Sequence, residues 1–327
     1  MDFIKLKKYL DSLNLPDFRF RQIKKNYLSG RYQSFFEMTD LPKDLRSSLE
    51  EYLPLLSVKE IKLVTGDSSQ KAVLGFSDNL AIETVFMNYD QWLTACVSSQ
   101  VGCPLNCAFC ATGKMGFKRN LTATEIVDQI LFWNAKLFPK YIGRIVFMGM
   151  GEPFLNWDEL LASLKFIKED LGLGSRKISI STAGIVPKIY EFANLNTEIN
   201  LAISLHAPNQ ESREKIMPIA KEYSFTDLIK SLNYYTAHTN RQLFLEYALI
   251  KDINDSPTHL QELISLLKSN RLFYLNLIPL NPVKGGLTSS LNLKLFTDTL
   301  EKNHLNFSLR QSLGQSINSA CGQLITE

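Results

Sequence analysis

The sequence lacks any run of 18 or more apolar residues, and a membrane-spanning helix requires about that length. Its first residues, MDFIKLKKYLDSLNLPDF, also lack the uncharged core and the small-residue cleavage site of a secretory signal peptide. We therefore expect a cytoplasmic protein that does not bind membranes. With 327 residues, 45% of them hydrophobic and 21% charged, the chain is long enough for one large α/β domain and a smaller one.

Cysteine is scarce, and its distribution argues against a disulfide framework. The chain has five cysteines, an odd number, and three of them lie within eight residues. In a cytosolic protein, such a cluster indicates metal binding or redox chemistry.

An excess of charge of one sign is also missing, since the net charge is only +3. Residues 1–32 are an exception, because they hold eight Lys or Arg residues against three Asp. Two interpretations of this basic segment remain open. It is either a solvated helix face or a patch that contacts the phosphates of a nucleic acid.

The order of the expected elements indicates an α/β fold. Apolar residues repeat at helical spacing in residues 1–55, which predicts a helical domain. Residues 56–92 are a β-rich connecting segment, with the strand-like stretches KEIKLVTG, KAVLGF and LAIETVFM. In residues 93–327 strands alternate with helices, beginning with a helix that Thr122 and Glu125 open as a capping box.

Alternating strands and helices predict parallel β/α units. About six such units are present, so we expect a partial (β/α)6 barrel with a small N-terminal helical accessory domain. The chemistry of such a barrel is expected at the C-terminal ends of its strands. Several informative positions fall there: residues 148–152, Ser181, residues 204–206 and Asn281.

The central motif contains Cys103, Cys107 and Cys110 at the spacing C-x3-C-x2-C. Three thiolates can bind a [4Fe–4S] cluster and leave one iron open, and that iron can chelate the amino and carboxylate groups of S-adenosylmethionine. One electron then releases a 5′-deoxyadenosyl radical, and Phe109 is placed to lie against the adenine. The alternative is a structural zinc site with a fourth ligand elsewhere, although the second C-x2-C knuckle of a zinc ribbon is missing.

The segment MGMGEP, residues 148–153, ends a predicted strand with glycines. Gly149 and Gly151 would let the backbone approach a ligand closely, and Glu152 would accept a hydrogen bond from the methionyl amino group. The alternative is an ordinary turn between a strand and a helix. The cysteine motif upstream in the same domain favours the ligand site.

Two further cysteines stand apart from the motif. Cys96 lies on a predicted strand, where a cysteine is most often a buried apolar residue. Cys321 lies in the small-residue segment SACGQL near the end of the chain. A flexible tail that carries a thiol can reach into an active site.

Taken together, the motifs strongly resemble those of the RlmN/Cfr family of radical S-adenosylmethionine RNA methyltransferases. The resemblance runs in order over essentially the whole chain, and it includes FRQIKKNYLSGRYQSFFEMTDLPKDLR, which is similar to the family's small RNA-binding accessory domain. The other stretches that carry it are CVSSQVGCPLNCAFCATGKMGFKRNLTATEI, FMGMGEPFLN, ISTAG, AISLHAP, MPI, NLIPLNP and ACGQL.

This resemblance implies a radical-SAM barrel and methylation of an RNA adenosine. Members of the RlmN type methylate carbon 2 of an adenosine in the peptidyl-transferase region of 23S rRNA, and also of an adenosine beside the anticodon of some tRNAs. Members of the Cfr type methylate carbon 8 and confer antibiotic resistance. GEP at 151–153 favours the RlmN type. A peptide- or small-molecule-modifying radical enzyme and a non-catalytic, zinc-stabilised RNA-binding protein are the alternatives.

The resemblance also implies residue roles. Cys321 corresponds to the methyl carrier, Cys96 to the thiol that resolves the protein–RNA adduct by forming a disulfide, and Glu83 to the proton acceptor. A monomer that uses two S-adenosylmethionine molecules per turnover and an external electron donor such as flavodoxin is expected. The positions that correspond to S-adenosylmethionine ligands are Gly151, Glu152, Ser181, Ser204, Leu205, His206 and Asn281.

The tail departs from the family pattern at two positions. Ser316 and Asn318 stand where the family usually has acids. The cysteine chemistry does not depend on these acids, so the departure concerns the geometry of the tail and the details of substrate binding.

Overall fold

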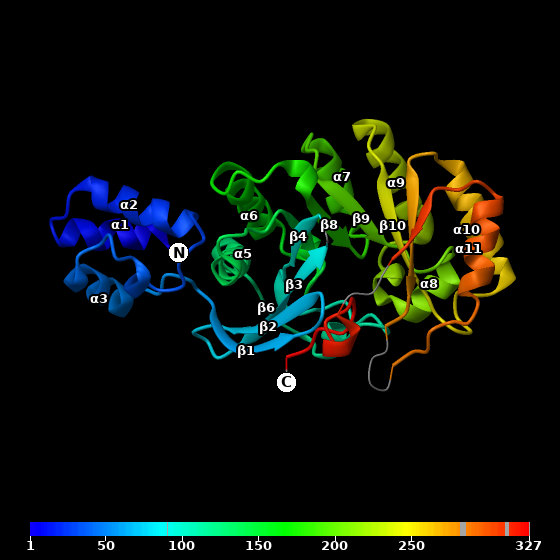
Figure 1. The fold of residues 1–327 in the computed structure, drawn as a ribbon. Helices are drawn as coiled ribbons and strands as arrows, with labels where there is room; N and C mark the ends of the chain where they lie inside the picture. The colour runs from blue at the N-terminus through cyan, green and yellow to red at the C-terminus, as the bar shows by residue number, and fades with distance from the viewer. Residues whose placement is uncertain (90, 282–285, 311–313, 327) are drawn as a thin grey trace.

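The computed structural model describes residues 1–89, 91–281, 286–310 and 314–326 (Figure 1). Its N-terminal part consists of the helices α1 (Phe3–Ser12), α2 (Asp17–Leu28) and α3 (Lys43–Tyr52), which lie together at one end of the molecule. Leu6, Ile23 and Leu49 of these helices are fully buried, and they belong to the hydrophobic core that continues into the rest of the molecule. The described residues contain no helix that is long and apolar enough to cross a membrane.

One sheet runs through the rest of the molecule, in the strand order β1-β2-β3-β4-β7-β8-β9-β10-β11-β12. The first four strands pair antiparallel, and from β4 to β12 all the pairs are parallel. The strands are β1 (Lys59–Thr65), β2 (Ser69–Gly75), β3 (Ala81–Tyr89), β4 (Trp92–Cys96), β7 (Arg144–Phe147), β8 (Ile178–Thr182), β9 (Asn200–Ser204), β10 (Leu243–Leu249), β11 (Phe273–Pro279) and β12 (Phe307–Leu309).

Helices connect the parallel strands and pack on their outer face, as expected for right-handed β/α units. Thr122 and Glu125 form the predicted capping box at the start of the first of these helices. The six β/α units that the sequence predicts are therefore present among the described residues. The helices are α5 (Ala123–Leu137), α6 (Trp157–Glu169), α7 (Val186–Asn194), α9 (Phe225–Thr239), α10 (Pro257–Ser269) and α11 (Leu293–Lys302), with the short α8 (Gln210–Ile216) before α9.

A second, two-stranded sheet frames the loop that carries the cysteine motif. It consists of β5 (Gln100–Gly102) and β6 (Phe117–Asn120), and the short helix α4 (Ala111–Lys114) lies between them. Gly102 has φ +74°, and a Cβ there would lie 1.8 Å from the carbonyl oxygen of Gly116. Only glycine allows the two strands to approach this closely.

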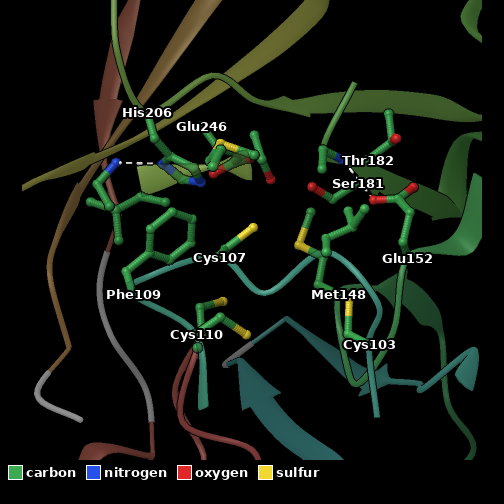
Figure 2. Close-up of a pocket in the computed structure, with 18 of the residues that line it drawn as sticks. Cys103, Cys107, Phe109, Cys110, Met148, Glu152, Ser181, Thr182, His206 and Glu246 are labelled. Carbon is green, nitrogen blue, oxygen red and sulfur yellow. Dashed lines mark hydrogen bonds between the residues drawn. The ribbon is translucent and has the colours of Figure 1, made fainter. Parts of the chain in front are cut away.

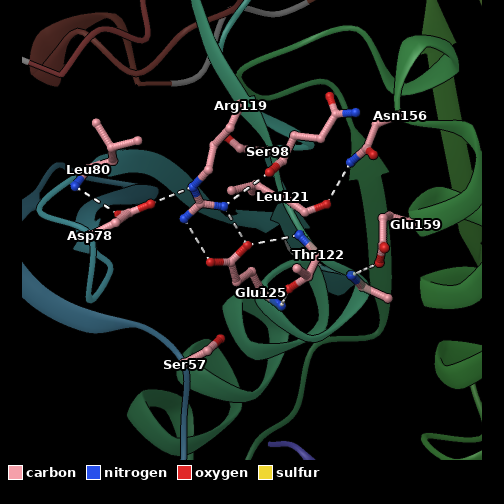
Figure 3. Close-up of polar contacts among 12 residues, drawn as sticks. Ser57, Asp78, Leu80, Ser98, Arg119, Leu121, Thr122, Glu125, Asn156 and Glu159 are labelled. Atoms are coloured by element: carbon pink, nitrogen blue, oxygen red, sulfur yellow. Dashed lines mark hydrogen bonds and ion pairs between the residues drawn. The ribbon is translucent and has the colours of Figure 1, made fainter.

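Polar contacts anchor this small sheet to the turn between β2 and β3 and to helix α5 (Figure 3). The Arg119 guanidinium of β6 lies 2.6 Å from an Asp78 oxygen and 2.8 Å from a Glu125 oxygen. The Asn156 side chain donates to the carbonyl oxygens of Ser99 and Leu121, at 2.8 and 2.7 Å. The frame of the cysteine loop is thus tied to the turn between β2 and β3 and to the start of α5.

The N-terminal helices are joined to the barrel through a buried carboxylate. Asp128 of α5 is fully buried and accepts hydrogen bonds from the Tyr27 hydroxyl at 2.5 Å and from the Ser57 backbone N–H at 2.6 Å. Tyr27 belongs to α2, and Ser57 lies between α3 and β1. The division into domains at residues 1–55, 56–92 and 93–327 remains a prediction.

Candidate active site

A cavity of about 170 Å³ opens where the parallel strands β7 to β11 end (Figure 2). This is the position that the strand–helix alternation predicts for the chemistry. Leu205 is the one predicted ligand of S-adenosylmethionine that does not line it. The predicted residues that do are Cys103, Cys107, Phe109, Cys110, Gly151, Glu152, Ser181, Ser204, His206 and Asn281.

Backbone hydrogen bonds fix the shape of the cysteine loop. The Cys103 N–H donates to the Gly116 carbonyl at 3.2 Å, and the Cys110 N–H donates to the Cys107 carbonyl at 3.1 Å. A Cβ at Gly113 would lie 3.1 Å from backbone atoms of Asn106 and Cys107. The three motif cysteines are therefore held around one side of the cavity, as Figure 2 shows.

The three motif cysteines need a nearby positive charge if their buried thiols are to be deprotonated. Burial raises the pKa of Cys103 to about 12, and it also raises the pKa values of Cys107 and Cys110. Metal ligation would supply the positive charge that keeps buried thiols deprotonated. A cluster with several irons binds each thiolate at a different iron, so the donor set fits such a cluster.

A buried acid also lines the cavity. Glu152 is 3% exposed, and its carboxylate accepts hydrogen bonds from the backbone N–H groups of Phe154 at 3.0 Å and Ala183 at 2.7 Å. Burial raises the pKa of Glu152 to about 7. Gly151 has φ +100°, and a Cβ there would lie 2.6 Å from the Gln100 side chain. The turn that presents Glu152 thus requires glycine.

An aromatic pair, one ring of which comes from the cysteine loop itself, also lines the cavity. The rings of Phe109 and His206 meet edge to face with their centroids 4.6 Å apart. His206 accepts a hydrogen bond from the Ala248 N–H through Nδ1, at 2.9 Å, so its proton resides on Nε2. Burial lowers the pKa of His206 to about 3, which keeps the ring neutral. Such a pair can hold a flat heterocycle and donate one hydrogen bond to it.

Cys321 lies at the boundary between this cavity and a smaller one. The smaller cavity is lined by Cys96, Tyr89, Arg310 and Asn281, and Cys321 lines both cavities. Cys96 is buried at the end of β4, whereas Cys321 is exposed. All five cysteines are free thiols, so the predicted Cys96–Cys321 disulfide is not supported by this structure.

Glu83 lies outside the linings of both cavities. Its side chain is 4% exposed, and one carboxylate oxygen lies 2.9 Å from the Lys71 ammonium. The other oxygen accepts a hydrogen bond from the Ile325 N–H at 3.0 Å. The structure therefore brings Glu83 to the tail that carries Cys321, but both oxygens of its carboxylate are engaged.

Comparison with known proteins gives a consistent result. Residues 97–265 match the radical SAM superfamily. The chain is 41% identical to a probable dual-specificity RNA methyltransferase RlmN of Bacillus licheniformis, over 98% of this chain and 90% of that protein. The corresponding protein of Dictyoglomus thermophilum is 44% identical, over 88% of this chain and 84% of its own length. The chain belongs to the RlmN family.

A solved structure of the same class supports this assignment. The crystal structure of a radical SAM methyltransferase from Sphaerobacter thermophilus has a TM-score of 0.90 and 37% sequence identity, and the match covers 99% of this chain and 97% of that one. This member of the RlmN family is thus a radical SAM RNA methyltransferase, and membership implies a [4Fe–4S] cluster, S-adenosylmethionine and an RNA substrate. The non-catalytic zinc interpretation is wrong.

The RlmN site also contains charged residues that sequence reasoning missed. Arg310 lines both cavities, and its guanidinium lies 3.3 Å from a carboxylate oxygen of Glu246, which also lines the larger cavity. Electrostatic interactions with Cys321 and Glu246 raise the pKa of Arg310. An acid inside the apolar strand LFLEYALI was the available signal for Glu246.

A third missed residue is Arg213 on α8. It is 1% exposed, and its guanidinium donates to the carbonyl oxygens of Ala183 at 2.5 Å and Ser204 at 3.3 Å. The same helix accepts a hydrogen bond at Ile216 from the Ala108 N–H of the cysteine loop, at 2.9 Å. Helix α8 therefore braces the cysteine loop against the ends of β8 and β9.

Proposed function

We propose that this enzyme methylates carbon 2 of an adenosine in the peptidyl-transferase region of 23S rRNA and of an adenosine beside the anticodon of tRNA. The dual specificity in the names of its relatives and the GEP sequence at 151–153 support this assignment over methylation of carbon 8. These RNA substrates place the reaction in the cytoplasm.

The observation that carries the proposal is the position of Cys321 between the two cavities. The larger cavity contains the cluster ligands and the predicted S-adenosylmethionine site, and the smaller one contains Cys96. A single sulfur at this boundary can accept a methyl group on one side and be attacked by a second thiol on the other. An electron-poor adenine carbon does not react directly with an electrophilic methyl group, so a carrier sulfur is needed.

When bound, the cluster and two S-adenosylmethionine molecules supply the methyl group and a carbon-based radical. The residues of the chain hold and orient these groups. Glu152 accepts a hydrogen bond from the methionyl amino group, and Phe109 and His206 hold the adenine ring. Ser181, Ser204 and Asn281 offer further polar groups in the same cavity.

The two tail-side cysteines complete the proposed reaction. The sulfur of Cys321 carries the methyl group and becomes joined through its carbon to the RNA base. Once the adduct has given up one electron, which the cluster could accept, the Cys96 thiolate attacks that sulfur. The S–S bond forms as the C–S bond breaks, and the electron pair of the C–S bond goes to the methylene carbon. Glu83 takes the proton from the ring carbon, and the methylene carbon gains a proton and becomes the methyl group. The transient bond between the two sulfurs is reduced by an external reductant.

The decisive test is nucleoside mass spectrometry of 23S rRNA and tRNA. RNA from a strain that lacks the gene should lose 2-methyladenosine in both RNAs, and the intact gene should restore it. The Cys321→Ala gene is the matched control and should restore nothing. Appearance of 8-methyladenosine on complementation, or methylation by the Cys321→Ala enzyme, would refute the proposal.

A further inference from the structure

The tail that carries Cys321 is held from two sides. On the side of the cysteine loop, the Ala111 N–H donates to the Gly322 carbonyl at 2.8 Å, and the Thr112 hydroxyl donates to the Leu324 carbonyl at 2.7 Å. These contacts lie directly after Cys321 in the chain. They attach the tail to the element that carries the cluster ligands.

On the other side, the tail contacts the antiparallel strands β2 and β3. The Lys71 ammonium of β2 donates to the Asn318 carbonyl at 3.0 Å, and the Ile325 N–H donates to the Glu83 carboxylate of β3 at 3.0 Å. One contact lies three residues before Cys321, and the other lies four residues after it.

Lys71 and Glu83 also pair with each other at 2.9 Å, and their side chains are only 10% and 4% exposed. A buried charge is costly unless it is paired and its remaining hydrogen-bonding groups are satisfied. The two tail contacts satisfy such groups on both partners. The pair is therefore most stable when the tail is docked against it.

We propose that Lys71 is a positioning residue that, through its ion pair with Glu83, fixes the tail on both sides of Cys321 and so sets the place of the carrier sulfur. This proposal rests on the proposed function for the role of Cys321. It also gives Glu83 a second task. The carboxylate that takes the proton in the proposed reaction therefore also holds the tail, through the Ile325 N–H.

The first measurement is hydrogen–deuterium exchange of the tail amides, residues 314–326, in the cluster-loaded enzyme without RNA. Lys71→Met should speed their exchange about tenfold or more, because charge-assisted hydrogen bonds are lost. Lys59→Met is the matched control, since Lys59 is an exposed residue of the neighbouring strand β1, and it should leave the tail unchanged. If Lys71→Met folds and its tail amides exchange as slowly as those of the wild type, the proposal is overturned.

The second measurement is the ratio of 5′-deoxyadenosine formed to adenosine methylated. A misplaced carrier leaves radical formation intact but makes it unproductive, so Lys71→Met should raise this ratio several-fold, and Lys71→Arg should restore it. An unchanged ratio would mean that the pair only joins β2 to β3. Tail exchange needs no RNA, so its result stands even if the wild-type enzyme methylates no adenosine.

Loss of one partner leaves a buried unpaired carboxylate, and Lys71→Met alone can therefore fail to fold. The double variant Lys71→Met with Glu83→Gln removes both charges and avoids this outcome. In this variant the tail amides should exchange faster than in the wild type, whereas the amides of β2 and β3 should exchange at the wild-type rate. Slow tail exchange in this variant would equally overturn the proposal.

Discussion

Glu152 makes S-adenosylmethionine binding depend on pH in a way that can be calculated. Its burial raises the pKa to about 7, well above the ordinary value of a glutamate. The amino group of the ligand hydrogen-bonds best to the ionised carboxylate. Because the pKa is raised, the carboxylate is lost as the pH falls through 7, and binding should weaken in the same interval.

The magnitude follows from the fraction ionised. With a pKa near 7, about one carboxyl in eleven is ionised at pH 6 and about ten in eleven at pH 8, so the affinity should rise about tenfold over this range. Glu152→Gln keeps the shape of the side chain but has no charge at any pH. At pH 8 it should bind about 10 to 100 times more weakly than the wild type, since a hydrogen bond to a charged group is lost.

The assay is anaerobic calorimetric titration of the cluster-loaded enzyme with S-adenosylmethionine at pH 6, 7 and 8. Titration of the ligand's own amine affects both proteins equally, so the ratio of wild-type to variant affinity isolates Glu152. That ratio should grow about tenfold from pH 6 to pH 8. Parallel pH profiles of the two proteins would show that Glu152 does not titrate in the site.

Other residues give equally direct outcomes. Cys107→Ser should yield a colourless protein without iron, and normal iron content would remove Cys107 from the cluster. Cys321→Ala should leave RNA unmethylated. Cys96→Ala should trap RNA on Cys321 as a nuclease-sensitive, slowly migrating band on a denaturing gel, and activity without this band would reduce Cys96 to a packing residue. Asp128→Ala leaves the Tyr27 hydroxyl and the Ser57 N–H without their acceptor. The free energy of unfolding, measured with denaturant, should therefore fall by about 3 kcal/mol or more. A decrease below about 1 kcal/mol would contradict this account.

Features that depend on nearby residues were predictable from the sequence. The capping box of Thr122 and Glu125 spans four residues, and the motif cysteines span eight, so local spacing was enough to identify both. The alternation of strands and helices gave the barrel for the same reason. Successive side chains of a strand point to opposite faces of the sheet. The motif SLH alone does not tell which of its three side chains face the cavity. Ser204 and His206 line the cavity, whereas Leu205 is fully buried beside it, and its role stays a prediction.

Contacts between distant residues were not predictable from one sequence. Asp128 meets Tyr27 across 101 positions, and Lys71 meets the tail at Asn318 across 247. Nothing in the spacing of these residues indicates that they touch. Cys96 and Cys321 were connected only by resemblance to a family, and the structure supplies the physical link by placing both on one small cavity.

The continuous sheet has a consequence for how the enzyme unfolds. Strand β4 pairs with β3 on one side and with β7 on the other, so the backbone hydrogen-bond ladder passes from the antiparallel strands into the barrel without a break. Separating the two parts would expose unpaired strand edges, so heat should melt them in a single cooperative transition. Helices α1 to α3 take no part in this ladder, so whether they melt in the same transition depends on the buried contacts of Asp128 with Tyr27 and Ser57.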